Sequence, residues 1–135
     1  MDTTLDFLVA EADKARNFSY SPYSEYKVGA SLLCSDGTVY TGCNIENASY
    51  SATVCAERVA LFKALSEGKR GFKAIAIVGG KGENPDFSPP CGVCLQVLSE
   101  FCSPDLQILL LLNGKIKSYT IKDFLPNAFS SADMK

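Results

Sequence analysis

Cys55-Ala56-Glu57-Arg58 stands where a polar loop gives way to a helical pattern, and Pro90-Cys91-Gly92-Val93-Cys94 stands at a second such point. Apolar residues with helical spacing follow each cluster, so both clusters are predicted at helix N-termini. Two helices that begin at the same end of a sheet would bring the clusters together. Three thiols with a carboxylate beside them then suit a tetrahedral zinc site that has an open fourth position and its own proton carrier.

The segments around these clusters alternate between helical and extended patterns. Helices are predicted to about residue 17, from residue 54, over 91–101 and after residue 120, and strands over 27–34, 38–43, 74–78, 106–112 and 116–120. Asn113-Gly114 predicts a tight hairpin between the last two strands, and Thr120 with Asp123 predicts a helix cap. This order predicts an α/β fold, a three-layer α/β/α sandwich on a mixed five-stranded sheet. The length of the chain predicts a single domain over residues 1–135.

Charge and hydropathy exclude several classes of partner. The chain has 13 basic and 15 acidic side chains, so it lacks the positive field that would attract a nucleic acid. The acidic segment 1–6 lacks the pattern of a signal peptide, and the longest apolar run, 108–112, is too short to cross a bilayer. We therefore expect a cytoplasmic protein with neither a membrane nor a nucleic acid as partner.

The six cysteines allow other interpretations. Disulfides are disfavoured in the reducing cytosol, and Cys34, Cys43 and Cys102 are expected to be buried, inert thiols. A structural zinc site needs four ligands, and because the chain has no histidine the fourth would be one of these thiols or a carboxylate. None of the three lies at an obvious second zinc knuckle. A redox pair at Cys91 and Cys94 is a further alternative.

The two clusters together resemble the zinc-dependent nucleoside deaminases, in which Cys-Ala-Glu is followed by Pro-Cys-x-x-Cys. The upstream residues narrow the resemblance to the small homotetrameric cytidine deaminases, and it runs over nearly the whole chain, to Leu125-Pro126 and Phe129. Those upstream residues are Tyr23-Ser24, Val28-Gly29-Ala30 and Gly42-Cys43-Asn44-Ile45-Glu46-Asn47-Ala48.

The resemblance implies a reaction and a metal. Cys55, Cys91 and Cys94 would bind one Zn²⁺ per subunit, with water in the open position. Glu57 would take a proton from that water, pass it to N3 of the cytosine ring and later help the amino group to leave. The expected activity is hydrolytic deamination of cytidine and 2′-deoxycytidine to uridine and 2′-deoxyuridine, with release of ammonia, in pyrimidine salvage.

The resemblance also implies substrate contacts. Asn44 and Glu46 would bind the ribose hydroxyls, and the backbone N–H of Ala56 would hold the base. Tyr26 stands where the family usually has a phenylalanine against the base. Phe129 would stack on the base in a neighbouring subunit's pocket, so the nucleoside site would be shared within a homotetramer.

Two positions depart from the family pattern. Pro89 replaces a serine that commonly precedes Pro-Cys, and Leu95 replaces an arginine that often follows the last zinc cysteine. Three thiolates around a dication leave a net negative charge, which cations outside the metal ligands offset. We therefore expect Arg58 to donate to a zinc thiolate and to carry this task with the two helix N-termini.

Other functions fit part of the pattern. A cytosine nucleoside antibiotic of the blasticidin type or a base in RNA are alternative substrates. Asn44 and Glu46 favour a free nucleoside, and the acidic charge disfavours RNA. A catalytically silent, zinc-stabilised binding module is a third alternative, but a structural site has no need of Glu57.

Overall fold

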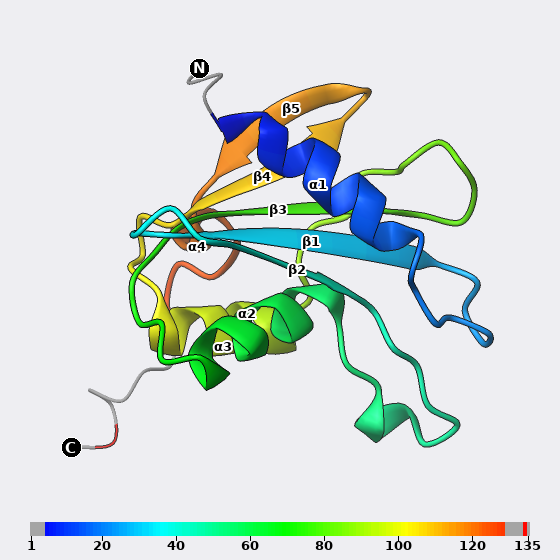
Figure 1. The fold of residues 1–135 in the computed structure, drawn as a ribbon, viewed down its shortest axis with the longest axis horizontal. Coiled ribbons are helices and arrows are strands. Elements are labelled where there is room, and N and C mark those ends of the chain that lie inside the picture. The colour runs from blue at the N-terminus through cyan, green and yellow to red at the C-terminus, as the bar shows by residue number, and fades with distance from the viewer. Residues whose placement is uncertain (1–4, 129–133, 135) are drawn as a thin grey trace.

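A mixed five-stranded sheet forms the middle layer of the computed structural model, which describes residues 5–128 and 134 (Figure 1). Its strands are β1 (Lys27–Cys34), β2 (Val39–Cys43), β3 (Phe72–Gly80), β4 (Gln107–Leu112) and β5 (Lys115–Tyr119). The strand order is β2-β1-β3-β4-β5. The β3–β4 pair is parallel and the other three neighbouring pairs are antiparallel, which confirms the predicted mixed sheet and its terminal hairpin.

Helices cover both faces of the sheet. Helix α1 (Phe7–Arg16) lies on one face, and α2 (Ala56–Ser66) and α3 (Gly92–Phe101) lie side by side on the other (Figure 1). The short helix α4 (Ile121–Phe124) adds Ile121 to the apolar cluster beneath α2 and α3, and a 3-10 helix, η2 (Tyr50–Ala52), lies in the loop before α2. The predicted three layers are confirmed. Among the described residues, no helix has the length and apolar content needed to cross a membrane.

Beyond Lys73 and Gln107 near their N-terminal ends, the parallel strands β3 and β4 are apolar because both of their faces are covered. Ile75, Ile77 and Ile108 belong to the larger cluster, which α2, α3 and α4 close. Ala76 and Leu109, one residue away in each strand, belong to the cluster that α1 closes. The short apolar runs predicted as buried strands are confirmed.

Glycines let the helices approach the sheet closely. A Cβ at Gly29 would lie 1.9 Å from the backbone oxygen of Ala12 in α1, and a Cβ at Gly42 would lie 2.6 Å from the backbone nitrogen of Ala60 in α2. Any side chain at either position would push the helix away. The close contact at Gly42 holds α2, and therefore Cys55, against the sheet.

The turn and cap predicted near the C-terminal end are confirmed. Asn113 and Gly114 both have positive φ, 52° and 78°, as a two-residue hairpin turn requires. Thr120 and Asp123 form a reciprocal capping box at the start of α4, with Thr120 N 2.8 Å from Asp123 Oδ2.

Several boundaries differ from the prediction, most of them by one residue. Helices α2 and α3 begin after Cys55 and Cys91, which are their N-cap residues rather than members of the first turn. Strand β3 extends beyond the predicted 74–78, because Gly79 and Gly80 pair with Val28 and Lys27 of β1. Glycine has a low intrinsic preference for strands, but the pairing with β1 overrides that local preference.

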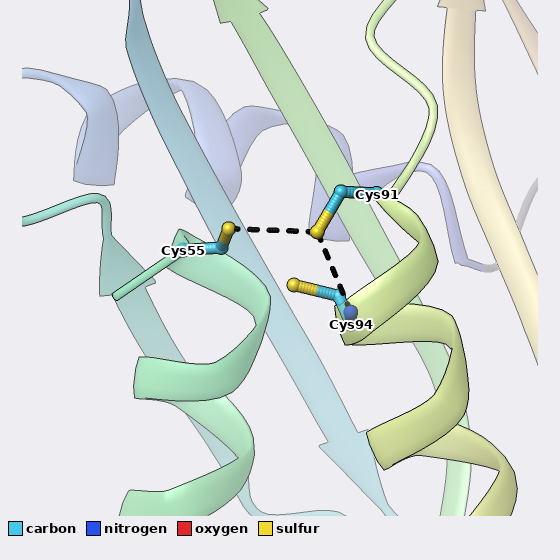
Figure 2. A group of neighbouring side chains, drawn as sticks. All are labelled: Cys55, Cys91 and Cys94. Carbon is cyan, nitrogen blue, oxygen red and sulfur yellow. Dashed lines mark hydrogen bonds between the residues drawn. The ribbon is translucent and has the colours of Figure 1, made fainter. Parts of the chain in front are cut away.

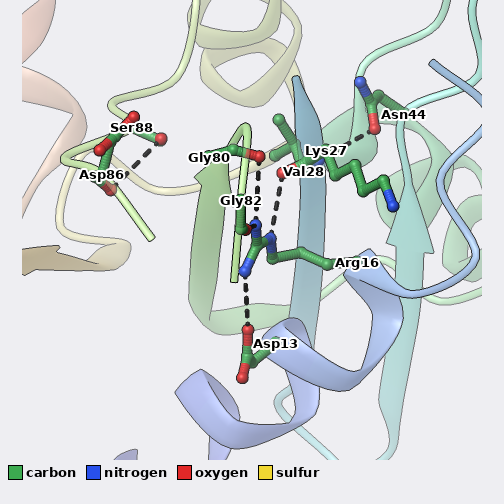
Figure 3. Close-up of polar contacts among 9 residues, drawn as sticks. All are labelled: Asp13, Arg16, Lys27, Val28, Asn44, Gly80, Gly82, Asp86 and Ser88. Atoms are coloured by element: carbon green, nitrogen blue, oxygen red, sulfur yellow. Dashed lines mark hydrogen bonds and ion pairs between the residues drawn. The ribbon is translucent and has the colours of Figure 1, made fainter. Parts of the chain in front are cut away.

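Arg16 ties the end of α1 to two strands (Figure 3). Its side chain is only 7% exposed. It donates to the carbonyl oxygens of Lys27 at 3.1 Å, Gly80 at 3.1 Å and Gly82 at 2.6 Å, and it also pairs with Asp13. These bonds fix the first half of the loop that leads from β3 to α3.

Candidate active site

Three cysteines meet where α2 and α3 begin side by side (Figure 2). Cys55 caps α2, Cys91 caps α3, and Cys94 lies in the first turn of α3. Their sulfur atoms all lie within 4.8 Å of one another, and Cys55 Sγ and Cys91 Sγ are 3.7 Å apart. The structure thus brings together the three predicted ligands from two segments that are distant in the sequence.

This donor set fits zinc. With Zn–S bonds of about 2.3 Å, two sulfurs of a tetrahedral site lie about 3.8 Å apart. The 3.7 Å between Cys55 and Cys91 is already close to that separation, so little movement is needed to grip an ion. Thiolates are soft ligands that suit zinc, and the free N–H groups and dipoles of two helix N-termini stabilise their charge.

The thiol of Cys94 donates a hydrogen bond to the Cys55 sulfur. The hydrogen bond from the Cys94 thiol, with help from Arg58, lowers the pKa of Cys55 to about 5. The same bond to Cys55, together with burial, raises the pKa of Cys94. A bound cation would take the place of this proton, which is how metal binding and thiol deprotonation are coupled.

Arg58 is a cation in direct contact with this cluster. Its Nη2 lies 3.6 Å from Cys55 Sγ and 3.4 Å from the carbonyl oxygen of Thr53. Leu95 follows Cys94 directly and is 5% exposed, packed in the core beneath α2 and α3, so it contributes no charge to the site.

Glu57 lies in the first turn of α2 and is 4% exposed. Burial raises its pKa to about 7, and the nearby thiolate of Cys55 adds to this rise. A carboxyl group with a pKa near neutrality can both accept and return a proton at working pH. Buried acids with such shifted pKa values are concentrated at functional sites.

A cavity of about 270 Å³ opens beside these groups. Predicted site residues line much of it: Tyr26, Asn44, Cys55, Ala56, Glu57 and Cys91. Phe87 and Ser88, from the loop before α3, complete one wall next to Pro89. The cavity thus joins one acid, two of the three thiols and a mostly apolar wall, which is how sites for small ligands are built.

Asn44 is held rigidly at the cavity wall. Its Oδ1 accepts from Ser19 Oγ at 2.5 Å and from Val28 N at 3.0 Å, and its Nδ2 donates to the Tyr26 carbonyl at 2.8 Å. Figure 3 shows the bond to Val28. One Nδ2 proton is used by the Tyr26 carbonyl, which leaves the other for a ligand.

Glu46 is buried close by but does not line the cavity. Its carboxylate accepts from the backbone N–H groups of Tyr23 at 3.0 Å and Ser24 at 3.1 Å, and from the Ser24 hydroxyl. The Ser24 hydroxyl is the main cause that lowers the pKa of Glu46. The predicted contact of Phe129 lies outside the described residues.

Sequence reasoning missed Phe87 and Ser88 as wall residues. They lie in an irregular loop rich in glycine and proline, where no periodicity shows which side chains turn inward. An aromatic residue in such a polar loop is the one signal that marks the segment. Its ring packs 6.2 Å from that of Tyr119, measured between centroids.

Comparison with known proteins gives consistent results. A family model described as the cytidine and deoxycytidylate deaminase zinc-binding region matches residues 2–110. Cytidine deaminase of Sporosarcina psychrophila is 52% identical over 128 residues, which cover 94% of this chain and 92% of that protein. Blasticidin-S deaminase of Bacillus cereus is 32% identical over 108 residues, which cover 76% of each chain.

The fold is similar to that of solved structures as well. A crystal structure of cytidine deaminase from Burkholderia pseudomallei superposes with a TM-score of 0.84 at 45% identity. That superposition covers 92% of this chain and 98% of the other.

Proposed function

Because the chain belongs to the cytidine deaminase family, we propose that it hydrolyses cytidine and 2′-deoxycytidine to uridine and 2′-deoxyuridine. In each turnover, water adds its oxygen at C4 of the cytosine ring and the C4 amino group leaves as ammonia. The observation that carries this proposal is the meeting of buried Glu57 with Cys55 and Cys91 at one cavity wall.

Cys55, Cys91 and Cys94 would hold one zinc ion per subunit. When bound, zinc supplies a Lewis acid that lowers the pKa of water toward neutrality. Glu57 accepts the proton that the water gives up and delivers it to N3 of the ring. It then carries a proton to the departing amino group, so one side chain acts first as base and then as acid. Its raised pKa supports both roles.

Ala56 and Tyr26 position the base. Ala56 is the first residue of α2, so its N–H has no partner within the helix and can donate to the cytosine ring. Its methyl group is small and fully buried, which leaves room for the ring beside Glu57. The Tyr26 ring lines the same cavity and packs against the base.

Asn44 and Glu46 bind the ribose hydroxyls in this proposal. The second Nδ2 proton of Asn44 donates to one hydroxyl. The Glu46 carboxylate is buried close to the cavity without lining it, and in this proposal it accepts from the other hydroxyl, with its remaining lone-pair capacity, when the ribose reaches it. Both groups belong to the segment that follows β2, which Glu46 ties to the backbone of Tyr23 and Ser24.

Self-association as a homotetramer completes the site in this proposal, with Phe129 of a neighbouring subunit stacking on the base. Phe18 is 81% exposed and Tyr50 is 69% exposed, and exposed aromatic side chains of this kind suit an interface between subunits. Light scattering on a size-exclusion column measures this state directly.

A cytoplasmic location is supported by the thiols. All six cysteines lie within the described residues and are free. A reducing compartment keeps them so and leaves three of them available to the metal.

Blasticidin-type antibiotics are the second candidate substrates, because a blasticidin-S deaminase is among the relatives. A substrate panel separates the two. The zinc-loaded protein is given equal concentrations of cytidine, 2′-deoxycytidine, blasticidin S and a cytosine-containing RNA, and ammonia release is measured. Fastest release from the two nucleosides supports the proposal, and release confined to the antibiotic or the RNA refutes it.

A further inference from the structure

Two hydroxyl groups join opposite parts of the cavity wall. Tyr26 precedes β1, and Ser88 lies in the loop between β3 and α3. Both side chains line the cavity, and the Tyr26 hydroxyl is hydrogen-bonded to Ser88 Oγ. The bond connects segments that are 62 residues apart in the sequence.

Gly79 makes this pairing possible. A Cβ at that position would lie 2.7 Å from Ser88 Oγ and 3.0 Å from Tyr26 Cε1. The ring and the serine therefore both rest on the bare backbone at the end of β3. Ser88 is 8% exposed, so its hydroxyl has little access to water and depends on protein partners.

The loop that contains Ser88 has few other hydrogen bonds at its cavity end, where the ring of Phe87 also packs against Tyr119. Its first half is tied to Arg16 through the Gly82 carbonyl, and Asp86 N donates to the Gly79 carbonyl at 2.7 Å. Beyond Asp86, Ser88 Oγ also reaches the Asp86 carbonyl, but at 3.4 Å (Figure 3). The Tyr26 hydroxyl is thus the close partner that holds Ser88 to the rest of the fold.

The hydrogen bond between Tyr26 and Ser88 matters because this loop carries cavity-lining residues and leads to Cys91. Phe87, Ser88 and Pro89 line the cavity, and Cys91 follows two residues after Pro89. A change in the position of this loop would therefore change the shape of the cavity that Asn44 and Glu57 also line.

We propose that Tyr26 and Ser88 form a positioning pair that holds the 87–89 wall in its substrate-binding position and thereby sets KM. The inference rests on the proposed deamination of cytosine nucleosides. The hydrogen bond between Tyr26 and Ser88 affects substrate binding rather than the chemical step, because it raises the fraction of molecules whose cavity is ready to bind. Loss of this bond lowers that fraction and weakens apparent binding in proportion, while the bound complex reacts as before.

The test compares Tyr26→Phe, Ser88→Ala and the double variant, all loaded with zinc. Tyr26→Phe keeps the ring and removes only the hydroxyl. Each single change is expected to raise KM for cytidine by up to about fivefold, the limit set by a hydrogen bond of about 1 kcal/mol. The value of kcat is expected to stay within about twofold. Because the two single changes remove the same hydrogen bond, the KM of the double variant is expected to be no higher than the higher KM of the two single variants.

Tyr40→Phe and Ser66→Ala are the matched controls. Tyr40 donates to Glu67 and Ser66 to the Lys63 carbonyl, both in exposed positions away from the cavity. Each control loses one hydroxyl bond and is expected to keep the wild-type KM. Unchanged KM in Tyr26→Phe, or KM increases that multiply in the double variant, would overturn the proposal.

A second measurement needs no substrate. Amide hydrogen exchange of the 84–92 peptide in the zinc-loaded, substrate-free protein is expected to be faster in Tyr26→Phe than in the wild type and in Tyr40→Phe. If the enzyme is active but exchange in Tyr26→Phe is unchanged, the proposed role of the Tyr26–Ser88 bond is refuted and the proposed function stands. A wild type that leaves cytidine intact overturns the proposed function and with it the effect on KM. If Ser88→Ala fails to fold, the KM and the hydrogen exchange of Tyr26→Phe decide the test.

Discussion

Arg58 Nη2 lies 3.6 Å from Cys55 Sγ and donates a hydrogen bond to that sulfur. A zinc ion held by the three thiolates would give the site a net charge near −1, which would make a water bound there less acidic. Leu95 is buried and uncharged, so the compensation falls on Arg58 and on the N-termini of α2 and α3. We therefore infer that Arg58 would carry more of the charge balance than one cation among several would.

Replacing Arg58 tests this role. Arg58→Ala is expected to lower kcat/KM more than about 100-fold, which exceeds the usual effect of changing a group that only supports a metal ligand. Arg58→Lys keeps the charge and is expected to recover part of the loss. Zinc content is measured on each sample. Near wild-type turnover by Arg58→Ala with zinc fully bound would contradict the account.

The stability of the loop at Glu46 is expected to depend on pH. The hydrogen bonds of Glu46 lower its pKa in the folded state, so they stabilise the fold above the ordinary pKa of a glutamate, and this contribution is lost as pH falls through the lowered value. Glu46→Gln is therefore expected to melt below the wild type at pH 7, and the gap is expected to close in acid. Thermal melts from pH 7 to pH 3 check this. A difference in melting temperature between the two proteins that stays constant over that range would show that the carboxylate charge does not contribute to stability.

Removal of zinc is expected to expose a specific pair of thiols. Cys55 has its pKa lowered to about 5 and Cys91 is exposed, whereas burial raises the pKa of Cys102 to about 12. Because the thiolate is the reactive form, iodoacetamide at pH 7 is expected to label Cys55 and Cys91 first after chelation and to leave Cys102 unlabelled. Peptide mass mapping gives the sites. Equal labelling of Cys55 and Cys91 with and without zinc would exclude them as ligands.

The contact between α1 and β1 is expected to tolerate no side chain at Gly29. A Cβ there would lie 1.9 Å from the Ala12 carbonyl oxygen, so Gly29→Ala forces the helix from the sheet. The expected loss is about 3 kcal/mol of unfolding free energy. Gly82→Ala is the control, because a Cβ there meets nothing within 4 Å. Urea unfolding that gives the same stability for both variants would contradict the packing described.

Much of the fold could be predicted because its signals are local. The apolar runs of β3 and β4, the Asn113-Gly114 turn and the Thr120–Asp123 cap each follow from a few adjacent residues. The end of β3 could not be predicted, since Gly79 and Gly80 are held in the strand by pairing with β1.

The candidate site likewise has one part that could be predicted from local sequence and one part that could not. The cysteine spacing placed three thiols at helix starts, and the structure gathers them. The partners of polar side chains depend on contacts between distant segments. Glu46 binds Ser24, and Tyr26 binds Ser88, through loops whose paths no periodic pattern specifies.

The central claim is tested most directly by mixing the purified, zinc-loaded protein with cytidine and following the ultraviolet change to uridine together with ammonia release. The wild type is expected to convert cytidine with one ammonia per uridine. Glu57→Gln, with zinc still bound, is expected to lose about 10²- to 10⁴-fold in kcat, the usual contribution of a general acid–base group. No conversion by the wild type with zinc bound, or undiminished conversion by Glu57→Gln, would contradict the account.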